Sequence, residues 1–417
     1  ALLLLGVFLG RLRALLLLGV RSPRTTRVSA LASLQDLGNR RGNGVAKLTK
    51  IQGRVLATVE QIAQPIGKLG RPSVQGLNTG MIPVYVVTGF LGSGKTTLLN
   101  RLIQHPRLAD TAVIVNEFGE IGIDHLLVER SLENTVLLAS GCLCCTVRGD
   151  LIDTLGDLAA KRDGGIVPTF ARVVIETTGL ADPAPVLQTL IGEPTVTTRY
   201  QLAGVITTVD TVHGMNQLDE HLEPLKQAAV ADVVVMTKID IASRKNVGAL
   251  RSRLSRISPV APILEVVGGD VDPDQLFTGL GSAQELSLRL AHMKEAAADG
   301  GSHDHHLQHG DLDVNRHDRR IAAISVIRDR PLEWPAVRTW LQSIASLRGN
   351  DLLRVKGIIN VVGIDTPVVV HGVQHIFDPP RRLDHWPDVD RRTRIVLIAR
   401  DFDDAELNAA LDAAIGA

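Results

Sequence analysis

The stretch of residues 82–100, IPVYVVTGFLGSGKTTLLN, decides the fold expected for this chain of 417 residues. A short β-branched run ends at Gly89, a glycine-rich loop follows, and apolar residues at helical spacing then predict a helix over residues 96–104. The loop fits the pattern GxxxxGK(S/T), whose glycines let successive backbone N–H groups turn toward phosphate oxygens. Because the motif follows a strand and opens a helix, the sequence predicts a phosphate-binding loop.

The residues of this loop are assigned to nucleotide binding. Lys95 is expected to reach the β- and γ-phosphates, and the hydroxyl of Thr96 is expected to ligate Mg²⁺. The N-terminus of the following helix adds a field that favours anions. The assigned residues are Gly89, Gly92, Ser93, Gly94, Lys95, Thr96 and Thr97.

Two glutamates at the ends of predicted strands complete the expected catalytic set with Lys95. Glu176 ends VVIE, and we predict that it holds Mg²⁺ directly or through water, while Gly179 offers a backbone N–H near the γ-phosphate. Glu117 ends TAVIVNE and is predicted to orient or deprotonate the attacking water, since phosphoryl transfer needs positioning more than a strong base. The alternatives are an ordinary strand-end glutamate at position 176 and a solvated loop carboxylate at position 117.

The run Thr237-Lys238-Ile239-Asp240 indicates which base is bound. In GTPases the pattern NKxD at this place reads guanine, because the aspartate accepts hydrogen bonds from N1–H and the 2-amino group while the lysine stem covers the base. Adenine lacks both donors, so Asp240 would penalise ATP by on the order of a few kcal/mol. Thr237 replaces the asparagine and removes an amide that braces the loop. A preference for guanine is therefore predicted, with its strength left open.

Near-continuous apolar strands alternate with helices after the loop, which predicts an α/β fold with a mainly parallel sheet covered on both faces. We expect residues 1–80 to be a leader, artefactual or disordered, and residues 81–290 to form a P-loop NTPase domain. Residues 291–318 are expected to be a His-rich linker. Residues 319–417 are expected to form a smaller α+β domain that begins with the strand IAAISVI and closes with a helix from Asp403.

All three cysteines lie in the run Gly141-Cys142-Leu143-Cys144-Cys145. An odd, clustered set cannot form a disulfide framework and indicates a reducing compartment. Three thiolates can converge on one ion if the backbone turns sharply, and they select Zn²⁺, Co²⁺ or Cu(I) over Mg²⁺. They also leave a fourth tetrahedral position open, which suits transfer of the ion. Buried core cysteines and a redox pair of Cys142 with Cys145 are the alternatives.

Composition excludes several classes of function. The formal net charge is +0 and the aromatic content is 3%, which argues against a nucleic-acid partner. Residues 1–35 contain no acidic residue and resemble an organelle transit peptide. The interpretation we favour is that this segment is upstream sequence translated from a misplaced start codon. We therefore expect a cytoplasmic location. Two arginines interrupt the apolar run, so no membrane span is expected. The histidines around positions 303–309 predict weak metal capture, against the alternative of a solvated linker.

Together these motifs resemble the CobW family of P-loop GTPases. The matching stretches are IPVYVVTGFLGSGKTTLLN, NEFGEIGID, GCLCCTVRGDL, ETTGLADP, the TKID loop, LLRVKGIINV, HGVQHIFDPP and RRTRIVLIAR. The resemblance covers residues 81–400, and Thr237 is the departure from the pattern. It implies that Cys142, Cys144 and Cys145 bind zinc or cobalt, that Mg²⁺–GTP favours the metal-loaded form, and that hydrolysis permits release.

The sequence therefore predicts a GTP-hydrolysing metallochaperone with GTP, Mg²⁺ and Zn²⁺ or Co²⁺ as its small-molecule partners. Its expected client is a metalloprotein or an enzyme of a zinc- or cobalt-using pathway such as cobalamin biosynthesis, and homo-oligomerisation is left open. One rival is a metal storage or buffer protein with a nucleotide switch, which turnover abolished by Lys95→Ala would oppose. The other is a thiol redox protein on a P-loop scaffold, which would not need Cys144.

Overall fold

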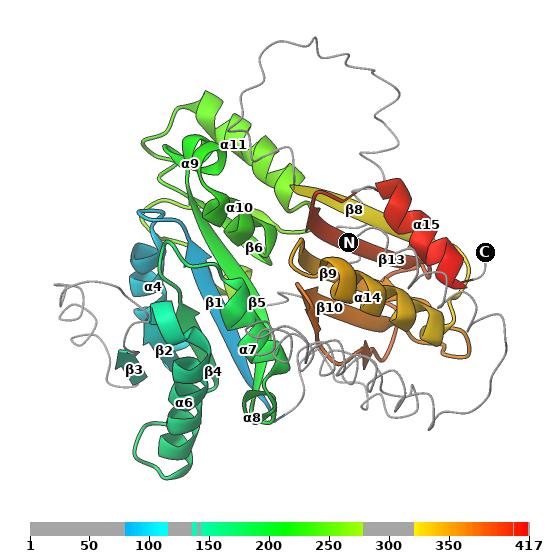
Figure 1. The fold of residues 1–417 in the computed structure, drawn as a ribbon. Helices are drawn as coiled ribbons and strands as arrows, with labels where there is room; N and C mark the ends of the chain where they lie inside the picture. The colour runs from blue at the N-terminus through cyan, green and yellow to red at the C-terminus, as the bar shows by residue number, and fades with distance from the viewer. Residues whose placement is uncertain (1–79, 116–135, 140–142, 278–320, 403, 416–417) are drawn as a thin grey trace, which may run out of the picture. The chain divides into compact units, whose positions relative to one another are not determined.

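A computed structural model describes residues 80–115, 136–139, 143–277, 321–402 and 404–415, with the backbone alone for residues 136–139, 143–148, 404 and 406. Within these ranges the chain forms one seven-stranded sheet and one six-stranded sheet (Figure 1). No helix among the described residues is long and apolar enough to cross a bilayer.

The seven-stranded sheet is parallel throughout, in the order β3-β2-β4-β1-β5-β6-β7. The strand before the phosphate loop, β1 (Ile82–Gly89), lies between β4 (Arg172–Glu176) and β5 (Tyr200–Asp210). The remaining strands are β2 (Thr111–Val115), β3 (Val136–Ala139), β6 (Val233–Thr237) and β7 (Ile263–Glu265).

Helical segments connect these strands and cover the sheet. They are α4 (Lys95–Ile103), η3 (Pro106–Leu108), α6 (Leu143–Asp163), α7 (Ala184–Gly192), α8 (Pro194–Thr197), α9 (Gly214–Glu220), α10 (Leu222–Ala229), α11 (Arg244–Ile257) and α12 (Pro273–Phe277). Parallel neighbours need crossover connections of this kind, because the chain must return to the same end of the sheet before each strand.

Both faces of the parallel sheet are buried, as alternate residues of β1 demonstrate. Val84 and Val86 share a core with residues of α6 and α7, whereas Tyr85 and Val87 share a core with residues of α4. This double burial explains why the strands read as near-continuous apolar runs rather than as alternating ones. The predicted α/β class with a mainly parallel sheet is confirmed.

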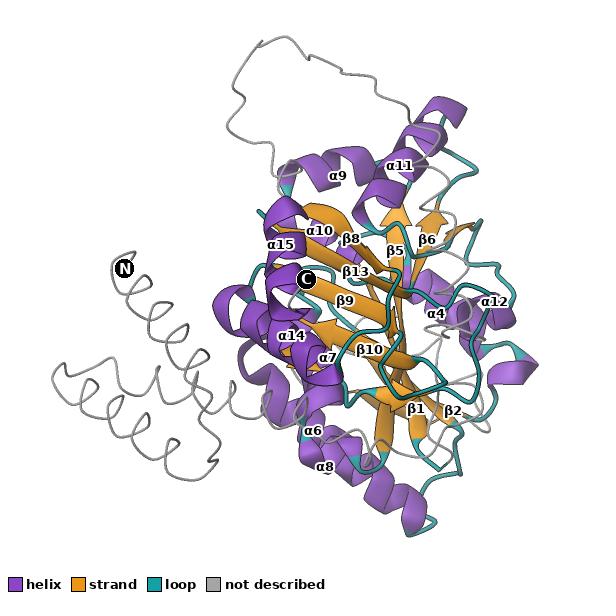
Figure 2. Cartoon of the chain, turned by 90° about the vertical axis from the view of Figure 1, so that its right-hand side faces the viewer, coloured by secondary structure: helices purple, strands orange, loops and turns teal. Residues whose placement is uncertain are grey.

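The six-stranded sheet is antiparallel and follows the order β11-β10-β9-β13-β8, with β12 paired to β10. Figure 2 shows α14 (Trp334–Arg348) and α15 (Asp404–Ile415) on one side of this sheet, where they contact each other and contribute to its core. The strands are β8 (Ile321–Arg328), β9 (Leu352–Ile359), β10 (Val368–Val373), β11 (Ile376–Phe377), β12 (Arg381–Arg382) and β13 (Thr393–Arg400).

The helices predicted after the phosphate loop and at the chain's end begin within one residue of their expected starts, whereas the strand predicted as VYVVTG begins two residues earlier, at Ile82. The helix expected over residues 96–104 is α4, and the helix expected from Asp403 is α15, which begins at Asp404. The edge strands β3 and β7 were not predicted, because runs of 4 and 3 residues are too short to display a period. The limits expected at residues 290 and 318 lie outside the described residues, so the division into domains stays a prediction.

The antiparallel sheet packs against α10 and α11 on the flank of the parallel sheet. Leu353, Val369 and Ile398 of the former share one core with Ala228 and Leu254 of the latter. One hydrophobic core therefore contains residues from both sheet regions.

A buried ionic cluster joins the two sheets at the same place. Asp232 precedes β6, and Arg354 of β9 donates to both of its carboxylate oxygens, at 3.0 and 3.1 Å. Lys356 forms an ion pair with the same carboxylate, and the backbone N–H of Val205 donates to it at 2.8 Å. The exposed fractions of the Asp232, Arg354 and Lys356 side chains are 2%, 5% and 6%, so the pairing excludes water.

Candidate active site

The predicted phosphate loop forms a tight turn between β1 and α4. Gly92 and Gly94 have φ values of +70° and +89°, which only glycine adopts without strain. A Cβ added at Gly89 would lie 2.3 Å from Thr208 Oγ1, so the loop is pressed against the end of β5. Ser93 Oγ lies 2.7 Å from the same Thr208 hydroxyl. Contacts with the end of β5 therefore position the phosphate loop, in addition to the backbone conformation of its glycines.

The N-terminus of α4 opens directly from this turn. Gly94 is the N-cap residue and has no side chain to cap the helix, so the first-turn N–H groups lack the usual side-chain acceptor. Lys95 lies within the loop and donates from Nζ to the carbonyl oxygens of Gly89 at 2.9 Å and Phe90 at 3.1 Å. Amide donors, a helix N-terminus and a buried ammonium thus converge on one small volume, which suits an oligophosphate.

Thr96 and Glu176 meet at the carboxyl end of the sheet. Thr96 Oγ1 donates to Glu176 Oε1 at 3.0 Å, and Glu176 is only 3% exposed. A hydroxyl and a carboxylate side by side are oxygen ligands of the type that Mg²⁺ prefers. The residues present therefore fit a magnesium ion next to the phosphate loop.

The loop after Glu176 is packed onto the phosphate loop. A Cβ at Gly179 would lie 2.8 Å from the backbone nitrogen and the Cα of Leu91, so only glycine allows the two loops to approach this closely. The side-chain amide of Gln227 in α10 donates to the carbonyl oxygens of Gly179 at 3.2 Å and Ala181 at 3.1 Å. Gln227 is fully buried, with 0% exposure, and its two hydrogen bonds hold the backbone of this loop in place.

The end of β6 carries the residues expected to contact the base. Thr237 Oγ1 donates to the carbonyl oxygen of Ser93 at 2.8 Å, so the threonine itself braces the phosphate loop. Lys238 has a φ of +58° and its Nζ donates to Asp210 Oδ2 at 2.7 Å. Asp240 is exposed in the turn that follows. The hydroxyl of Thr237 thus contacts the phosphate loop directly, although the amide of the asparagine is absent.

Asp210, at the end of β5, is the buried carboxylate that pairs with Lys238. Burial by itself raises the pKa of its carboxyl, but hydrogen bonds from Lys238, His213 and Val212 outweigh the burial and lower the pKa below its ordinary value. The backbone N–H groups of Val212 and His213 donate to Oδ1 at 2.7 and 3.1 Å. The ammonium group of Lys238 is thereby tied to the end of β5.

The structure brings together the predicted residues Gly89, Gly92, Ser93, Gly94, Lys95, Thr96, Thr97, Glu176, Gly179, Thr237, Lys238 and Asp240 at the carboxyl ends of β1, β4 and β6. Glu117, Cys142 and the His-rich segment lie outside the described residues. Cys144 and Cys145 lie in the first turn of α6, where the description covers the backbone alone. Among the described residues no group of three or more His, Cys, Asp or Glu side chains could hold a metal ion.

Sequence reasoning missed Asp210, Thr208 and Gln227. The signal for Asp210 was present, because an acidic residue closes the apolar run of β5 at the sheet edge where ligands bind in parallel α/β folds. Gln227 gave no such signal. It lies 48 residues from Gly179 in the sequence, and only the packing of α10 brings the two together.

Comparison with known proteins places this fold and site in a family. The domain family described as CobW/HypB/UreG, nucleotide-binding domain, matches residues 83–265, and the Cobalamin synthesis protein cobW C-terminal domain matches residues 321–415. The zinc chaperone YjiA of Escherichia coli (strain K12) is 32% identical over 333 residues, which cover 79% of this chain and 97% of that protein. The zinc chaperone CobW of Pseudomonas aeruginosa is 30% identical over 384 residues, 83% of this chain and 95% of that protein.

Among solved structures, that of Zn(II)-bound YjiA GTPase from E. coli matches with a TM-score of 0.58 and 29% identity, over 81% of this chain and 99% of that chain. The chain therefore belongs to the CobW-type family of P-loop GTPases. The resemblance drawn from the sequence motifs is confirmed.

Proposed function

We propose that this protein hydrolyses GTP and uses the nucleotide state to hold and release a transition-metal ion, zinc or cobalt, for delivery to a client metalloprotein. The names of the relatives, zinc chaperones, support the metallochaperone class. Binding of zinc or cobalt by the three cysteines and delivery of the ion to a client are the parts of the proposal that go beyond these names.

The observation that carries the proposal is the register of the parallel sheet. Ala139 of β3 pairs with Val115 of β2, Val115 pairs with Glu176 of β4, and Glu176 pairs with Val87 of β1. These residues form one row across the sheet. Ala139 precedes the cysteine segment, Val115 precedes the segment of Glu117, and Val87 precedes the phosphate loop. Glu176 is itself the carboxylate proposed to hold Mg²⁺. With about 4.8 Å between strands, Ala139 at the end of β3 lies about 14 Å across the sheet from Val87 of β1.

In the proposed reaction the residues of this chain mostly position groups and neutralise charge. The phosphate loop and Lys95 hold the β- and γ-phosphates, and Gly179 presents its backbone N–H to the γ-phosphate. Thr96 and Glu176 would hold Mg²⁺, which would supply charge neutralisation at the phosphate oxygens. Glu117 is proposed to orient the attacking water.

Guanine selectivity is proposed to come from Asp240, with the stem of Lys238 covering the base. The ion pair of Lys238 with buried Asp210 supports this assignment, because it fixes the lysine in a direction that a solvated side chain would not keep. Cys142, Cys144 and Cys145 are proposed to bind the metal ion as its carried substrate. The strands that precede the Glu117 and cysteine segments, β2 and β3, are neighbours in the sheet. We therefore propose that metal binding and nucleotide state are coupled at this edge of the sheet.

The test is a titration of Zn²⁺ or Co²⁺ into the metal-free full chain with Mg²⁺ and either a non-hydrolysable GTP analogue, GDP or no nucleotide. Cobalt–thiolate absorption reports the ligands, and a triple Cys→Ser variant is the control. We expect the GTP analogue to tighten cysteine-dependent metal binding, and linkage then requires metal to tighten GTP by the same factor, commonly about 5- to 150-fold.

Two results would contradict the proposal. Metal affinity that is the same in all three nucleotide conditions would remove the coupling. GTP turnover that survives Lys95→Ala would remove the assignment of the phosphate loop.

A further inference from the structure

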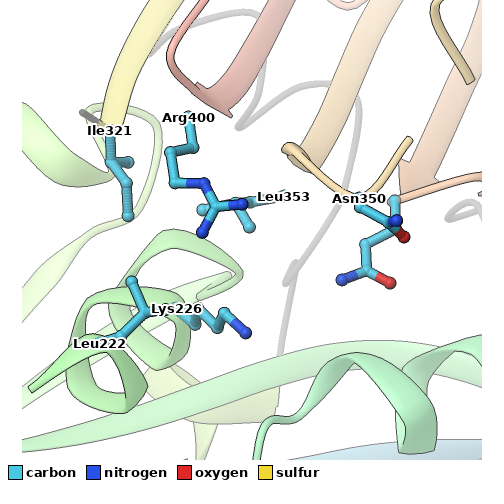
Figure 3. Close-up of a pocket in the computed structure, with 7 residues that line it drawn as sticks. Leu222, Lys226, Ile321, Asn350, Leu353 and Arg400 are labelled. Atoms are coloured by element: carbon cyan, nitrogen blue, oxygen red, sulfur yellow. The ribbon is translucent and has the colours of Figure 1, made fainter. Parts of the chain in front are cut away.

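A cavity of about 240 Å³ lies between α10 and the antiparallel sheet, away from the phosphate loop. Figure 3 shows the polar ends of Lys226, Asn350 and Arg400 directed into this space. Leu222 and Leu353 supply apolar wall, and the side chain of Gln374 completes the polar part of the lining. Two cations and two amides therefore face a small cavity that α10 shares with the second sheet.

The charge of the lining has one sign. The lining contains Lys226 and Arg400 but neither Asp nor Glu. The side chains of these two cations are only 24% and 34% exposed, so their fields are less screened than those of surface charges. A partly enclosed site with fixed cations, amide donors and an apolar wall suits a compact anion that carries some hydrocarbon.

Each cation already holds a carboxylate at the edge of the cavity. Lys226 Nζ donates to Asp182 Oδ2 at 2.7 Å, and Arg400 Nη2 donates to Asp351 Oδ1 at 2.8 Å. Both cations are therefore placed and oriented for carboxylate oxygens, and an incoming carboxylate can share or replace these partners. The planar guanidinium of Arg400 in particular matches the two oxygens of a carboxylate.

Gln374 of the cavity wall is held in place by a residue of the parallel-sheet region. It lies in the two-residue turn between β10 and β11 with a φ of +55°, the backbone conformation that such hairpin turns use. The side-chain amide of Gln188, in α7, donates to Gln374 Oε1 at 2.5 Å and fixes the position of this side chain. Gln374 is therefore a fixed part of the cavity wall.

We propose that this cavity binds a compact ligand with two carboxylates, one at Lys226 and the other at Arg400, with its hydrocarbon part against Leu222 and Leu353. The volume corresponds to about eight water molecules, which admits a small organic diacid or the end of one acidic peptide segment. Both kinds of ligand carry two carboxylates, and the experiment below distinguishes a free diacid from an acidic peptide.

Binding at this cavity is linked to the nucleotide site through α10, and this part rests on the proposed GTPase function. Asp182, the partner of Lys226, also accepts the backbone N–H of Ala184 at the start of α7. Gln227, the next residue of α10, holds the carbonyl oxygens of Gly179 and Ala181. A ligand that draws Lys226 away from Asp182 therefore changes the restraint on the loop that contacts the phosphate loop.

The experiment measures binding of succinate, and separately of the capped dipeptide N-acetyl-Asp-Asp-amide, to the metal-free full chain by calorimetry. We expect saturable binding of at least one, weakened about tenfold or more by Arg400→Gln and by Lys226→Gln, since each removes a charge-assisted hydrogen-bond donor. Lys161→Gln is the matched control, because that lysine is also paired with an aspartate at 2.7 Å but lies on α6. Succinamide, which has the same size without the charges, is not expected to bind.

The outcomes separate the site, its ligand and its linkage. Preference for succinate identifies a free diacid and preference for the dipeptide an acidic polypeptide, whereas binding of neither overturns the proposal. Equal affinities for Arg400→Gln, Lys161→Gln and the unaltered protein also overturn it. The linkage requires that the affinity differ between protein with Mg²⁺–GTP analogue and protein without nucleotide, and equal affinities refute it. GTP turnover of the unaltered protein without any carboxylate is measured in parallel, so its absence would refute the proposed function alone.

Discussion

Replacing Asp232 by asparagine is expected to weaken the junction between the two sheets by several kcal/mol. The substitution keeps the size of the side chain and an oxygen that can accept the N–H of Val205, but it removes the negative charge between Arg354 and Lys356. Two cations with 5% and 6% exposure then lose this carboxylate partner in a buried site.

The magnitude follows from the burial of the cluster. Removing one partner of a buried ion pair costs about 3–5 kcal/mol, because the remaining charge stays desolvated. With a urea dependence of about 3 kcal/mol/M, the midpoint of unfolding should fall by about 1–1.7 M. Asp157→Asn is the matched control, since Asp157 pairs with Lys161 at an exposed site and should change stability by less than about 1 kcal/mol.

The pH dependence provides a second, independent measure of the same charge. Burial raises the pKa of the Asp232 carboxyl, but Arg354 and Lys356 outweigh it and hold the pKa well below its usual range. Its ionised form therefore contributes stability that is fully present above the unfolded-state pKa of about 3.9 and is lost as the pH falls toward the folded-state pKa.

The assay is urea unfolding of the unaltered protein and of Asp232→Asn at several pH values. The difference between their free energies of unfolding should be constant between about pH 5 and pH 7 and should narrow below about pH 4. A difference under about 1 kcal/mol at pH 7, or one that does not narrow in acid, would refute the reasoning.

Three further predictions concern the nucleotide site. Gly179→Ala should displace the phosphate loop and lower GTP turnover strongly, whereas Gly156→Ala, where an added Cβ meets nothing within 4 Å, should leave turnover unchanged. Thr237→Val keeps the shape but removes the hydrogen bond to Ser93, so the affinity for a fluorescent GDP should fall about 2- to 10-fold; an unchanged affinity would show that the brace is dispensable. Gln227→Met should lower kcat more than it changes KM, because the loop loses its restraint; equal effects on both would argue against this role.

The sequence by itself determined the phosphate loop, its flanking strand and helix, and the α/β class. These features are local, because the glycines, Lys95 and Thr96 follow one another along the chain and because apolar periodicity is a property of neighbouring residues. The two-sided burial of β1 was also readable, since each of its faces needs apolar side chains. The identity of Glu176 as a strand-end carboxylate followed from the same pattern.

Only the tertiary structure decided the order of the strands and the partners of the buried polar groups. The chain passes from β1 to β2, yet β4 lies between them, and no local pattern specifies that insertion. Asp210 finds Lys238 across 28 residues, and Asp232 finds Arg354 across 122. Each pairing depends on how several crossover connections pack together. The sequence therefore does not reveal which charges become buried or which residues offset the free-energy cost of burying them.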